Sequence, residues 1–324
     1  MTATRALVPQ PQSQISAGVI PSRARHFVDA ARAENTVRAY RAAWEDFCAY
    51  CAQTGARSRP ADPATVADYL TTLAEGGLKV STLAVRLSAI SQAHRLGGHP
   101  DPTRHEAVKM LMSGIRRKLG SAPAQKAPVL RDDIRRMVAV QPDMLAGLRN
   151  RALLLVGFAG AFRRSELTGL DVSDLRFTDE GVVITLRRSK TDQEGRGIVK
   201  HIPTLKSRAL CPVTALRRWL EEADIHQGPI FRAVDRWGHV RKRRLTAQVV
   251  AAVVKQAAVA AGLDPRQYAG HSLRAGFVTQ ASLDDEDVLS IQEVTGHTDM
   301  NTIVKYQRSA GRKARETVRR AMGE

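Results

Sequence analysis

Six side chains in the second half of the sequence could together carry out chemistry on a phosphate ester: Arg163, Lys190, His271, Arg274, His297 and Tyr306. The two arginines are permanently charged forks that suit the non-bridging oxygens of a phosphate, and the two histidines are further donors. The lysine is an acid that can hand a proton to a leaving oxygen, and the tyrosine is a phenol that can attack phosphorus. Positive charge held ready around a pentavalent phosphorus is the main catalytic resource for such a reaction.

The six residues fall in four short clusters. These are 162–167 (FRRSEL), 189–192 (SKTD), 271–274 (HSLR) and 296–299 (GHTD), with Tyr306 nine positions after His297. His271 and Arg274 are three apart, so at a helix N-terminus they point the same way, and that terminus itself favours an anion. Taken singly, each cluster also has an ordinary explanation, such as a solvated arginine pair, a turn lysine or a packed tyrosine.

Two choices among these residues stay open. Arg163 and Arg164 are adjacent, so on a helix they lie about 100° apart and only one of them can face the phosphate. Lys200, on the strand that returns from the SKTD turn, competes with Lys190 for the role of the acid. The position of Lys190 at the tip of a hairpin favours it, because a hairpin end can reach into a groove of the substrate.

The elements that must position these residues form two domains. Residues 1–22 are rich in Pro, Gln, Ser and Ala, and we predict a disordered tail. Residues 23–119 carry four helical patterns, with predicted starts at Asn35, Asp62-Pro63, Ser81 and about Arg104. Residues 120–128 are small and proline-bearing, which predicts a linker between this domain and a second one at 129–324.

The second domain mixes helices with a few strands. We predict strands at 182–188 and 198–202, joined by an Asp- and Gly-rich turn, and a short strand at 229–231. We predict helices near 132–140, 148–162, 212–223, 246–261, 272–283, 285–295 and 300–307, with a charged tail helix from about 312.

The composition indicates a basic protein that binds nucleic acid. Lys and Arg outnumber Asp and Glu by 50 to 32, a formal net charge of +18 that favours an extended polyanion. No apolar run approaches the roughly 20 residues that span a bilayer, and the N-terminus lacks the apolar core of a signal peptide. Cys48, Cys51 and Cys211 are too few for a disulfide framework, so we expect a cytoplasmic protein.

The order and spacing of the four clusters resemble those of the tyrosine recombinases, also called phage integrases, over about residues 30–324. The FRRSEL segment is similar to the first-arginine box of that family, SKTD to its hairpin lysine, HSLR to its His-x-x-Arg box, and GHTD followed by VKY to its nucleophile segment. The two-domain layout is similar to that of Cre- and Xer-type members. The resemblance implies a mainly α fold: an all-helical, SAM-like core-binding domain, then an α+β catalytic domain with a small antiparallel sheet.

The resemblance also implies a role for each residue. Tyr306 attacks the scissile phosphate to leave a 3′-phosphotyrosyl link, and Lys190 protonates the departing 5′-oxygen, which leaves as a free hydroxyl. The transition state is stabilised by Arg163, Arg274, His271 and His297. Glu166 braces the arginine and the histidine, and its spacing selects Arg163 over Arg164. Because the phosphotyrosyl ester keeps the energy of the broken bond, neither ATP nor any other cofactor is expected, and we see no carboxylate cluster suited to Mg²⁺.

DNA contacts are expected from both domains. The candidates are Arg38, Arg86, Arg116, Arg117, Arg232, Arg243 and Arg244, by their position in family-like elements. Most of them would bind phosphate and supply affinity rather than sequence choice, although each is also consistent with a solvated charged face.

Recombination between two duplexes implies a homotetramer on DNA with an inverted-repeat site, a tail helix that docks on a neighbouring subunit, and association with the nucleoid. Two alternatives are a type IB topoisomerase and a catalytically silent DNA-binding regulator. The short interval between His297 and Tyr306 disfavours the first, and the complete set of active-site residues disfavours the second.

Overall fold

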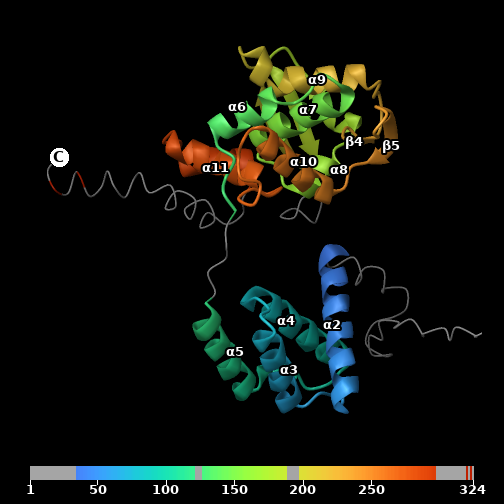
Figure 1. The fold of residues 1–324 in the computed structure, drawn as a ribbon, viewed down its shortest axis with the longest axis vertical. Helices are drawn as coiled ribbons and strands as arrows, with labels where there is room; N and C mark the ends of the chain where they lie inside the picture. The colour runs from blue at the N-terminus through green and yellow to red at the C-terminus, as the bar shows by residue number, and fades with distance from the viewer. Residues whose placement is uncertain (1–33, 121–125, 188–196, 297–318, 320–321, 323–324) are drawn as a thin grey trace, which may run out of the picture. The chain divides into compact units, whose positions relative to one another are not determined.

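The chain divides into two compact units, Met1–Ala124 (unit 1) and Gln125–Glu324 (unit 2), each considered by itself (Figure 1). The computed structural model describes residues 34–120, 126–187 and 197–296, with 319 and 322. The division between the units falls inside the segment 120–128. The predicted tail at 1–22, the predicted helix at 300–307 and nearly all of the tail from 312 lie outside the described residues.

Unit 1 is helical throughout its described residues. Its helices are α2 (Glu34–Thr54), α3 (Pro63–Glu75), α4 (Val80–Leu96) and α5 (Glu106–Leu119), with a 3-10 turn, η2 (Pro102–Arg104), before α5. Their apolar faces share one core that includes Phe47, Tyr69, Leu70, Leu83 and Ile90. Apolar residues that recur three and four positions apart therefore produce four amphipathic helices around one core.

The start of α3 at Pro63, after its N-cap Asp62, is as predicted, whereas the starts of the other three helices differ from the predicted ones by a few residues. α4 starts at Val80, so Ser81 lies inside its first turn rather than capping it, and Asn35 lies within α2. α5 starts after His105, whose Nδ1 accepts a hydrogen bond from the backbone N–H of Ala107 at 3.3 Å. The predicted start near 104 is early because η2 forms a separate turn.

A buried histidine holds the loop between α2 and α3 to α4. His94 is fully buried; its Nδ1 lies 2.8 Å from the carbonyl oxygen of Ile90, and its Nε2 accepts from the N–H of Ala61 at 2.9 Å. Because Nε2 must accept, the neutral ring with its proton on Nδ1 fits this site. Burial accordingly lowers the pKa of His94.

Unit 2 is organised around a buried helix, α7 (Leu145–Ala159). This helix contacts α6 (Arg131–Ala139), α8 (Arg164–Gly169), α9 (Pro212–Glu222), α10 (Ala247–Ala260) and α11 (Ser272–Leu283) (Figure 1). α12 (Val288–Thr295) packs on α11. The apolar run of α7 explains its place, since a helix that is hydrophobic on most sides must be covered on most sides.

A small antiparallel sheet lies beside these helices. It has the order β1 (Leu175–Phe177), β2 (Gly181–Leu186) and β3 (Ile198–Pro203). In its register Val182 faces Ile202 and Ile184 faces Lys200. The remaining elements are a hairpin of β4 (Arg232–Val234) and β5 (Val240–Arg244), and the 3-10 turns η3 (Val172–Asp174) and η4 (Arg208–Leu210). The predicted mainly helical fold, with an α+β second domain and a small antiparallel sheet, is confirmed.

Three local predictions for unit 2 were wrong. The strand expected at 229–231 lies instead at β4, and Pro229 makes only an isolated bridge with Asp171. The helix expected at 148–162 ends at Ala159, because the chain turns at Gly160 and at Ala161, which has a φ of 47°. The helix expected from 285 starts at Val288, after Asp287 caps it through hydrogen bonds to two backbone N–H groups.

None of the helices in the described ranges combines the length and the apolar composition needed to cross a bilayer.

His94 should make unit 1 sensitive to mild acid. The pKa of His94 is lowered in the folded protein, so below the unfolded value of about 6.5 the unfolded chain takes up a proton first. The stability that neutral His94 contributes is therefore complete above that pH and declines as the pH falls further. We expect the protection factors for hydrogen exchange across residues 61–94, which are the rates corrected for the intrinsic effect of pH, to fall below about pH 6 in the full chain.

The variant His94→Gln retains a donor and an acceptor but does not titrate, so its exchange in this region should depend less on pH. His226→Gln, which changes an exposed histidine of unit 2, is the control. An unchanged pH dependence in His94→Gln would show that His94 is not the titrating group.

Candidate active site

The first cluster of the sequence forms the entry to α8. Arg163 is its N-cap, with an extended backbone, and Glu166 lies one turn later. One carboxylate oxygen of Glu166 accepts from the backbone N–H of Arg163 at 2.8 Å, and the other accepts from Nη1 of the same residue at 2.6 Å. The side chains of Arg163 and Glu166 are only 14% and 3% exposed. This ion pair is therefore largely removed from water, which strengthens it.

The neighbouring arginine is directed elsewhere. Arg164 is exposed, and its aliphatic stem passes so close to Gly270 that a Cβ there would lie 2.1 Å from the Cδ of Arg164. The two arginines thus separate at the start of α8. Arg163 joins the buried charges described below, while Arg164 covers the turn before α11.

The third cluster starts α11. His271 is its N-cap and is exposed, whereas Arg274 is only 2% exposed. Nη1 of Arg274 donates to the carbonyl oxygen of Ala161 at 2.7 Å, so α11 is joined to the turn that immediately precedes Arg163. α7 packs on α11 beside this contact, and a Cβ at Gly157 of α7 would lie 2.9 Å from the Cδ1 of Leu273.

The chain that follows the segment 120–128 lies across α11. The N–H of Val129 donates to the carbonyl oxygen of Ser272 at 2.9 Å, and that of Ala127 donates to Gln267 at 2.8 Å. At Gly276 a Cβ would lie 1.9 Å from the carbonyl oxygen of Val129, so no side chain fits there. We call residues 126–131 the strap; they fix the N-terminal half of α11, which carries His271 and Arg274.

A lysine of β3 completes the group of charges. Lys200 is 5% exposed, its Nζ donates to the carbonyl oxygen of Val294 in α12, and it lies 5.3 Å from the ring centroid of Phe162. Burial and the positive charges of Arg274 and Arg163 lower the pKa of Lys200 to about 8, while Glu166 opposes the shift. Three cations and one carboxylate thus meet among the described residues of unit 2. We call Arg163, Glu166, Lys200 and Arg274 the charge cluster.

Lys190, His297 and Tyr306 lie outside the described residues. The flanks of their segments are described: β2 and β3 are paired up to Leu186 and Ile198, and α12 ends at Thr295, followed by Gly296 with a φ of 65°. The choice between Lys190 and Lys200 as the acid therefore stays a prediction.

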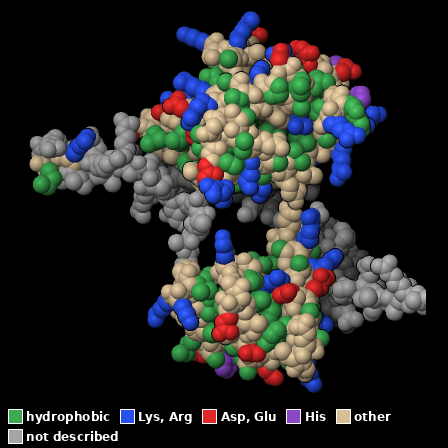
Figure 2. Space-filling view, in the orientation of Figure 1, with side chains coloured by type: hydrophobic (Ala, Val, Ile, Leu, Met, Phe, Trp, Pro, Cys, Tyr) green, Lys and Arg blue, Asp and Glu red, His purple; other side chains and the backbone are tan. Residues whose placement is uncertain are grey.

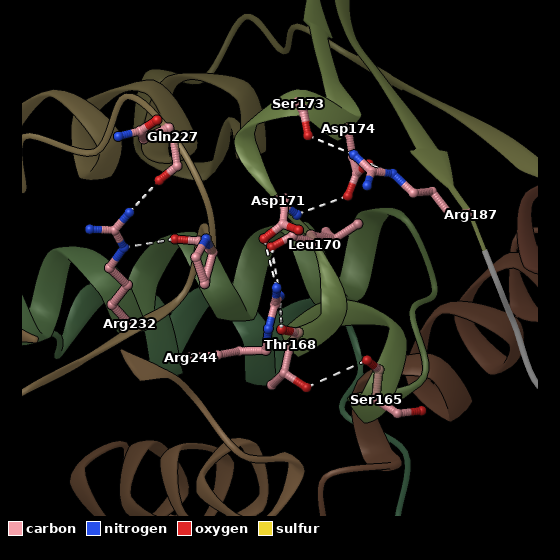
Figure 3. Close-up of polar contacts among 11 residues, drawn as sticks. Ser165, Thr168, Leu170, Asp171, Ser173, Asp174, Arg187, Gln227, Arg232 and Arg244 are labelled. Carbon is pink, nitrogen blue, oxygen red and sulfur yellow. Dashed lines mark hydrogen bonds and ion pairs between the residues drawn. The ribbon is translucent and has the colours of Figure 1, made fainter. Parts of the chain in front are cut away.

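Two of the arginines predicted to bind DNA are engaged with the protein's own backbone (Figure 3). Nη1 of Arg244 donates to the carbonyl oxygens of Thr168 and Leu170 at 2.7 and 3.1 Å, and its Nη2 lies 2.7 Å from Asp171. Arg244 thereby satisfies carbonyls at the C-terminal end of α8. Arg232 donates to the carbonyl oxygens of Pro229 and Gln227.

A third predicted DNA contact, Arg86, is held between helices of unit 1. Its Nη1 donates to the carbonyl oxygen of Ala42 on α2 at 3.1 Å, it lies 3.6 Å from Asp46, and its side chain is 21% exposed. Exposed side chains are found at the other four candidates: Arg38, Arg116, Arg117 and Arg243. Lys and Arg side chains appear on the displayed face of both units in Figure 2.

The arrangement suits an anion and not, among the described residues, a metal ion. No group of three or more His, Cys, Asp and Glu side chains in the described ranges is placed to hold a metal. The charge cluster instead carries an excess of positive charge, next to the N-terminus of α11, where the helix dipole also favours an anion. A phosphate with two non-bridging oxygens fits donors of this kind.

The sequence alone did not predict the structural roles of Arg244, Arg232 and the strap. Their contacts are with backbone carbonyl and N–H groups, which leave no residue-specific pattern in a sequence. Lys200 was considered only as a rival acid. The one signal for its burial was its place in the alternation of β3, where Lys200 and Ile202 point to the same face.

Comparisons with known proteins give the chain a family and several relatives. The family model described as "Phage integrase family" matches residues 129–312, and that of the "Phage integrase, N-terminal SAM-like domain" matches 26–96. An integrase/recombinase xerD homolog of Selenomonas ruminantium is 38% identical over 88% of this chain and 84% of its own length. The Cre recombinase of Escherichia phage P1 is 25% identical over 85% and 84% of the two chains.

Solved structures share the fold. An integrase of the transposon Tn1549 in complex with transposon right end DNA has a TM-score of 0.62 at 15% identity, covering 94% of this chain and 98% of its own. The XerH site-specific recombinase bound to a palindromic substrate has a TM-score of 0.61 at 18% identity, covering 80% and 72%.

The match of the integrase model to more than half of the chain, together with the relative at 38% identity, establishes the family. This chain belongs to the phage integrase family of tyrosine recombinases, enzymes that cleave and rejoin DNA strands.

Proposed function

We propose that this enzyme exchanges strands between two DNA duplexes through a 3′-phosphotyrosyl intermediate on Tyr306. The observation that carries the proposal is the charge cluster, in which two arginines from α8 and α11 and a lysine from β3 share a single described carboxylate, Glu166. Such an excess of buried positive charge is costly unless an anion completes it. The scissile phosphate is that anion.

Each residue of the site has a role in the proposed transfer. Arg163 and Arg274 bind the non-bridging oxygens of the phosphate, and His271 and His297 add hydrogen bonds. Glu166 holds Arg163 at both its backbone and its guanidinium, so the arginine is positioned before DNA binds. The geometry supports Arg163 rather than Arg164, because Arg164 extends over Gly270.

The reaction breaks one ester bond and forms another. The phenol oxygen of Tyr306 attacks phosphorus, the bond from phosphorus to the 5′-oxygen breaks, and His271 receives the phenol proton. Lys190 supplies a proton to the 5′-oxygen, which departs as a hydroxyl. Attack by a 5′-hydroxyl from the second duplex reverses these steps, releases the tyrosine and completes the exchange without an energy source.

The exposed arginines would hold the duplex. Arg38, Arg116 and Arg117 of unit 1, and Arg243 of unit 2, are proposed to bind DNA phosphates, whereas Arg86, Arg232 and Arg244 brace the protein itself. Because each phosphate contact releases counterions, their contributions should depend on salt.

The proposed assembly is a homotetramer with two duplexes, each carrying an inverted-repeat site, and the enzyme would be associated with the nucleoid when bound. The strand-exchange proposal differs from simple relaxation of supercoils and from binding without cleavage. A cleavage experiment distinguishes all three.

Tyr306→Phe should bind DNA normally and form no covalent adduct, because only the attacking oxygen is removed. The site can be selected from random duplexes with this variant and then placed in a nicked suicide substrate. The unaltered protein should then trap a protein–DNA adduct with a free 5′-hydroxyl, detected by denaturing electrophoresis.

An unaltered protein that binds the selected site but gives no adduct would refute the proposed reaction. An adduct in Tyr306→Phe would identify a different nucleophile. Relaxation of supercoils without joint molecules would identify a topoisomerase.

Glu166→Ala should destabilise the protein by about 3 kcal/mol, because it leaves Arg163 beside two other buried cations without its carboxylate. It should also slow cleavage, since Arg163 loses its two anchors. The control is Asp143→Ala, which removes an exposed ion pair with Arg218 and should cost less than about 1 kcal/mol. Urea unfolding measures both; equal effects of the two variants would contradict the buried brace.

Arg117→Ala should change DNA binding, whereas Arg244→Ala should change the stability of the protein. Removal of a phosphate contact at Arg117 should lower the slope of log affinity against log salt by about 0.9 and leave stability unchanged. Removal of Arg244 should leave that slope unchanged and destabilise the protein by about 1–3 kcal/mol, because carbonyls at the end of α8 lose their donor. Fluorescence anisotropy across a salt series, with thermal unfolding, measures both; the reverse pattern would exchange the two assignments.

A further inference from the structure

Lys200 is the member of the charge cluster that has no role in the reaction as proposed. We propose that Lys200 is a positioning residue: by donating to the carbonyl oxygen of Val294 it fixes the C-terminal end of α12, and with it the start of the segment that carries His297, against the arginines that bind the phosphate. The inference rests on the proposed function above, which it deepens by assigning the residue that joins two parts of the site.

The contact is made at a helix end that needs a donor. The last four carbonyl groups of a helix have no partner within the helix, and the helix dipole favours a cation there. Val294 is the penultimate residue of α12, and the Nζ of Lys200 donates to its carbonyl oxygen. A cation from β3 thus occupies the place where the end of α12 is most receptive to one.

A second residue of β3 reinforces this contact. Ile198 precedes Lys200 by two positions, so both side chains point to the same face of the strand. A Cβ at Gly296 would lie 3.5 Å from the Cδ1 of Ile198, which places Ile198 against the residue immediately before His297. β3 therefore meets the end of α12 at two successive positions of one face.

The other side of Lys200 faces the arginines. Its Nζ lies 5.3 Å from the ring centroid of Phe162, the residue before Arg163, and the charges that act on it are those of Arg274, Glu166 and Arg163. One ammonium group thus contacts α12 and lies beside the elements that carry both arginines. These parts are separated by up to 131 residues in the sequence, from Arg163 to Val294.

A purely structural role does not explain a lysine at this place. Lys200 is 5% exposed and its charge is repelled by two arginines, so an uncharged side chain of similar length would pack there with less cost. Nor does the contact suit a proton donor that must reach a leaving oxygen, because the Nζ is already engaged with Val294. The charged Lys200 instead fixes the position of α12 relative to Arg163 and Arg274.

The test compares Lys200→Met with Lys206→Met, an exposed lysine of the loop after β3. In single-turnover cleavage of the suicide substrate, Lys200→Met should be slower by about 100-fold, the effect of a misplacement of about 1 Å, with affinity for DNA and thermal stability unchanged. Hydrogen exchange at residues 291–296 should accelerate in Lys200→Met alone. Lys200→Gln, which keeps a donor, should recover part of the rate and of the protection.

A substrate with sulfur in place of the 5′-bridging oxygen separates positioning from acid catalysis. The thiolate leaves without a proton, so this substrate should restore cleavage by Lys190→Met and should not restore it in Lys200→Met. Rescue of Lys200→Met would show that Lys200 is the acid and overturn the inference. So would a normal cleavage rate, unchanged exchange at 291–296, or a joint loss of stability and DNA affinity.

The exchange measurement needs no cleavage. If the unaltered protein formed no adduct, the proposed function would fail, while faster exchange at 291–296 in Lys200→Met would still support the tie between Lys200 and α12.

Discussion

The structure of the second unit is constrained by the repulsion between like charges that are largely removed from water. Arg163, Lys200 and Arg274 lie close together with one carboxylate, Glu166, among them in the described structure. Such a group would separate or take up water if it were free to move. The group is held together because each cation is fixed by its own contact. Arg163 is fixed by Glu166, Arg274 by the carbonyl of Ala161 and Lys200 by that of Val294.

The supporting elements follow from this requirement. α8 is only six residues long, too short to be stable alone, and it is tied at its start by Glu166 and at its end by Arg244. On α7, Gly157 lies against the side chain of Leu273 of α11, and the strap lies against α11 at Gly276, where no side chain fits. The packed core of unit 2 therefore holds the charge cluster in place, although the like charges of the cluster repel one another.

The sequence predicted the parts of this arrangement that are repetitive or made by named side chains. Apolar spacing gave the helices, and turn residues gave β2 and β3. The spacing of Arg163, His271 and Arg274 predicted a phosphate site, and this stays a prediction. The predicted end of α7 was wrong because the turn at Ala161 requires a left-handed backbone, which alanine does not signal. The hairpin of β4 and β5 was missed because its second strand, Val-Arg-Lys-Arg-Arg, has no apolar alternation.

Other features could not be predicted because they depend on the backbone of distant segments. In the sequence, Arg244 and Arg86 cannot be told from DNA-binding arginines, yet their partners are carbonyl oxygens and carboxylates on other elements. Only the fold brings those oxygens within reach. For the same reason the burial of Lys200 against Val294 is invisible in the sequence, where the two residues are 94 positions apart.

The strap attaches the chain that follows unit 1 to α11 and to the turn before it. Unit 1 ends at Ala124, and within a few residues the chain is hydrogen-bonded to Gln267 and Ser272, on either side of His271. A load applied to the strap therefore acts first on the turn before α11 and on Gly276, where the two backbones are in direct contact. A pull on the strap thus acts on the helix that carries Arg274 before it acts on the rest of unit 2.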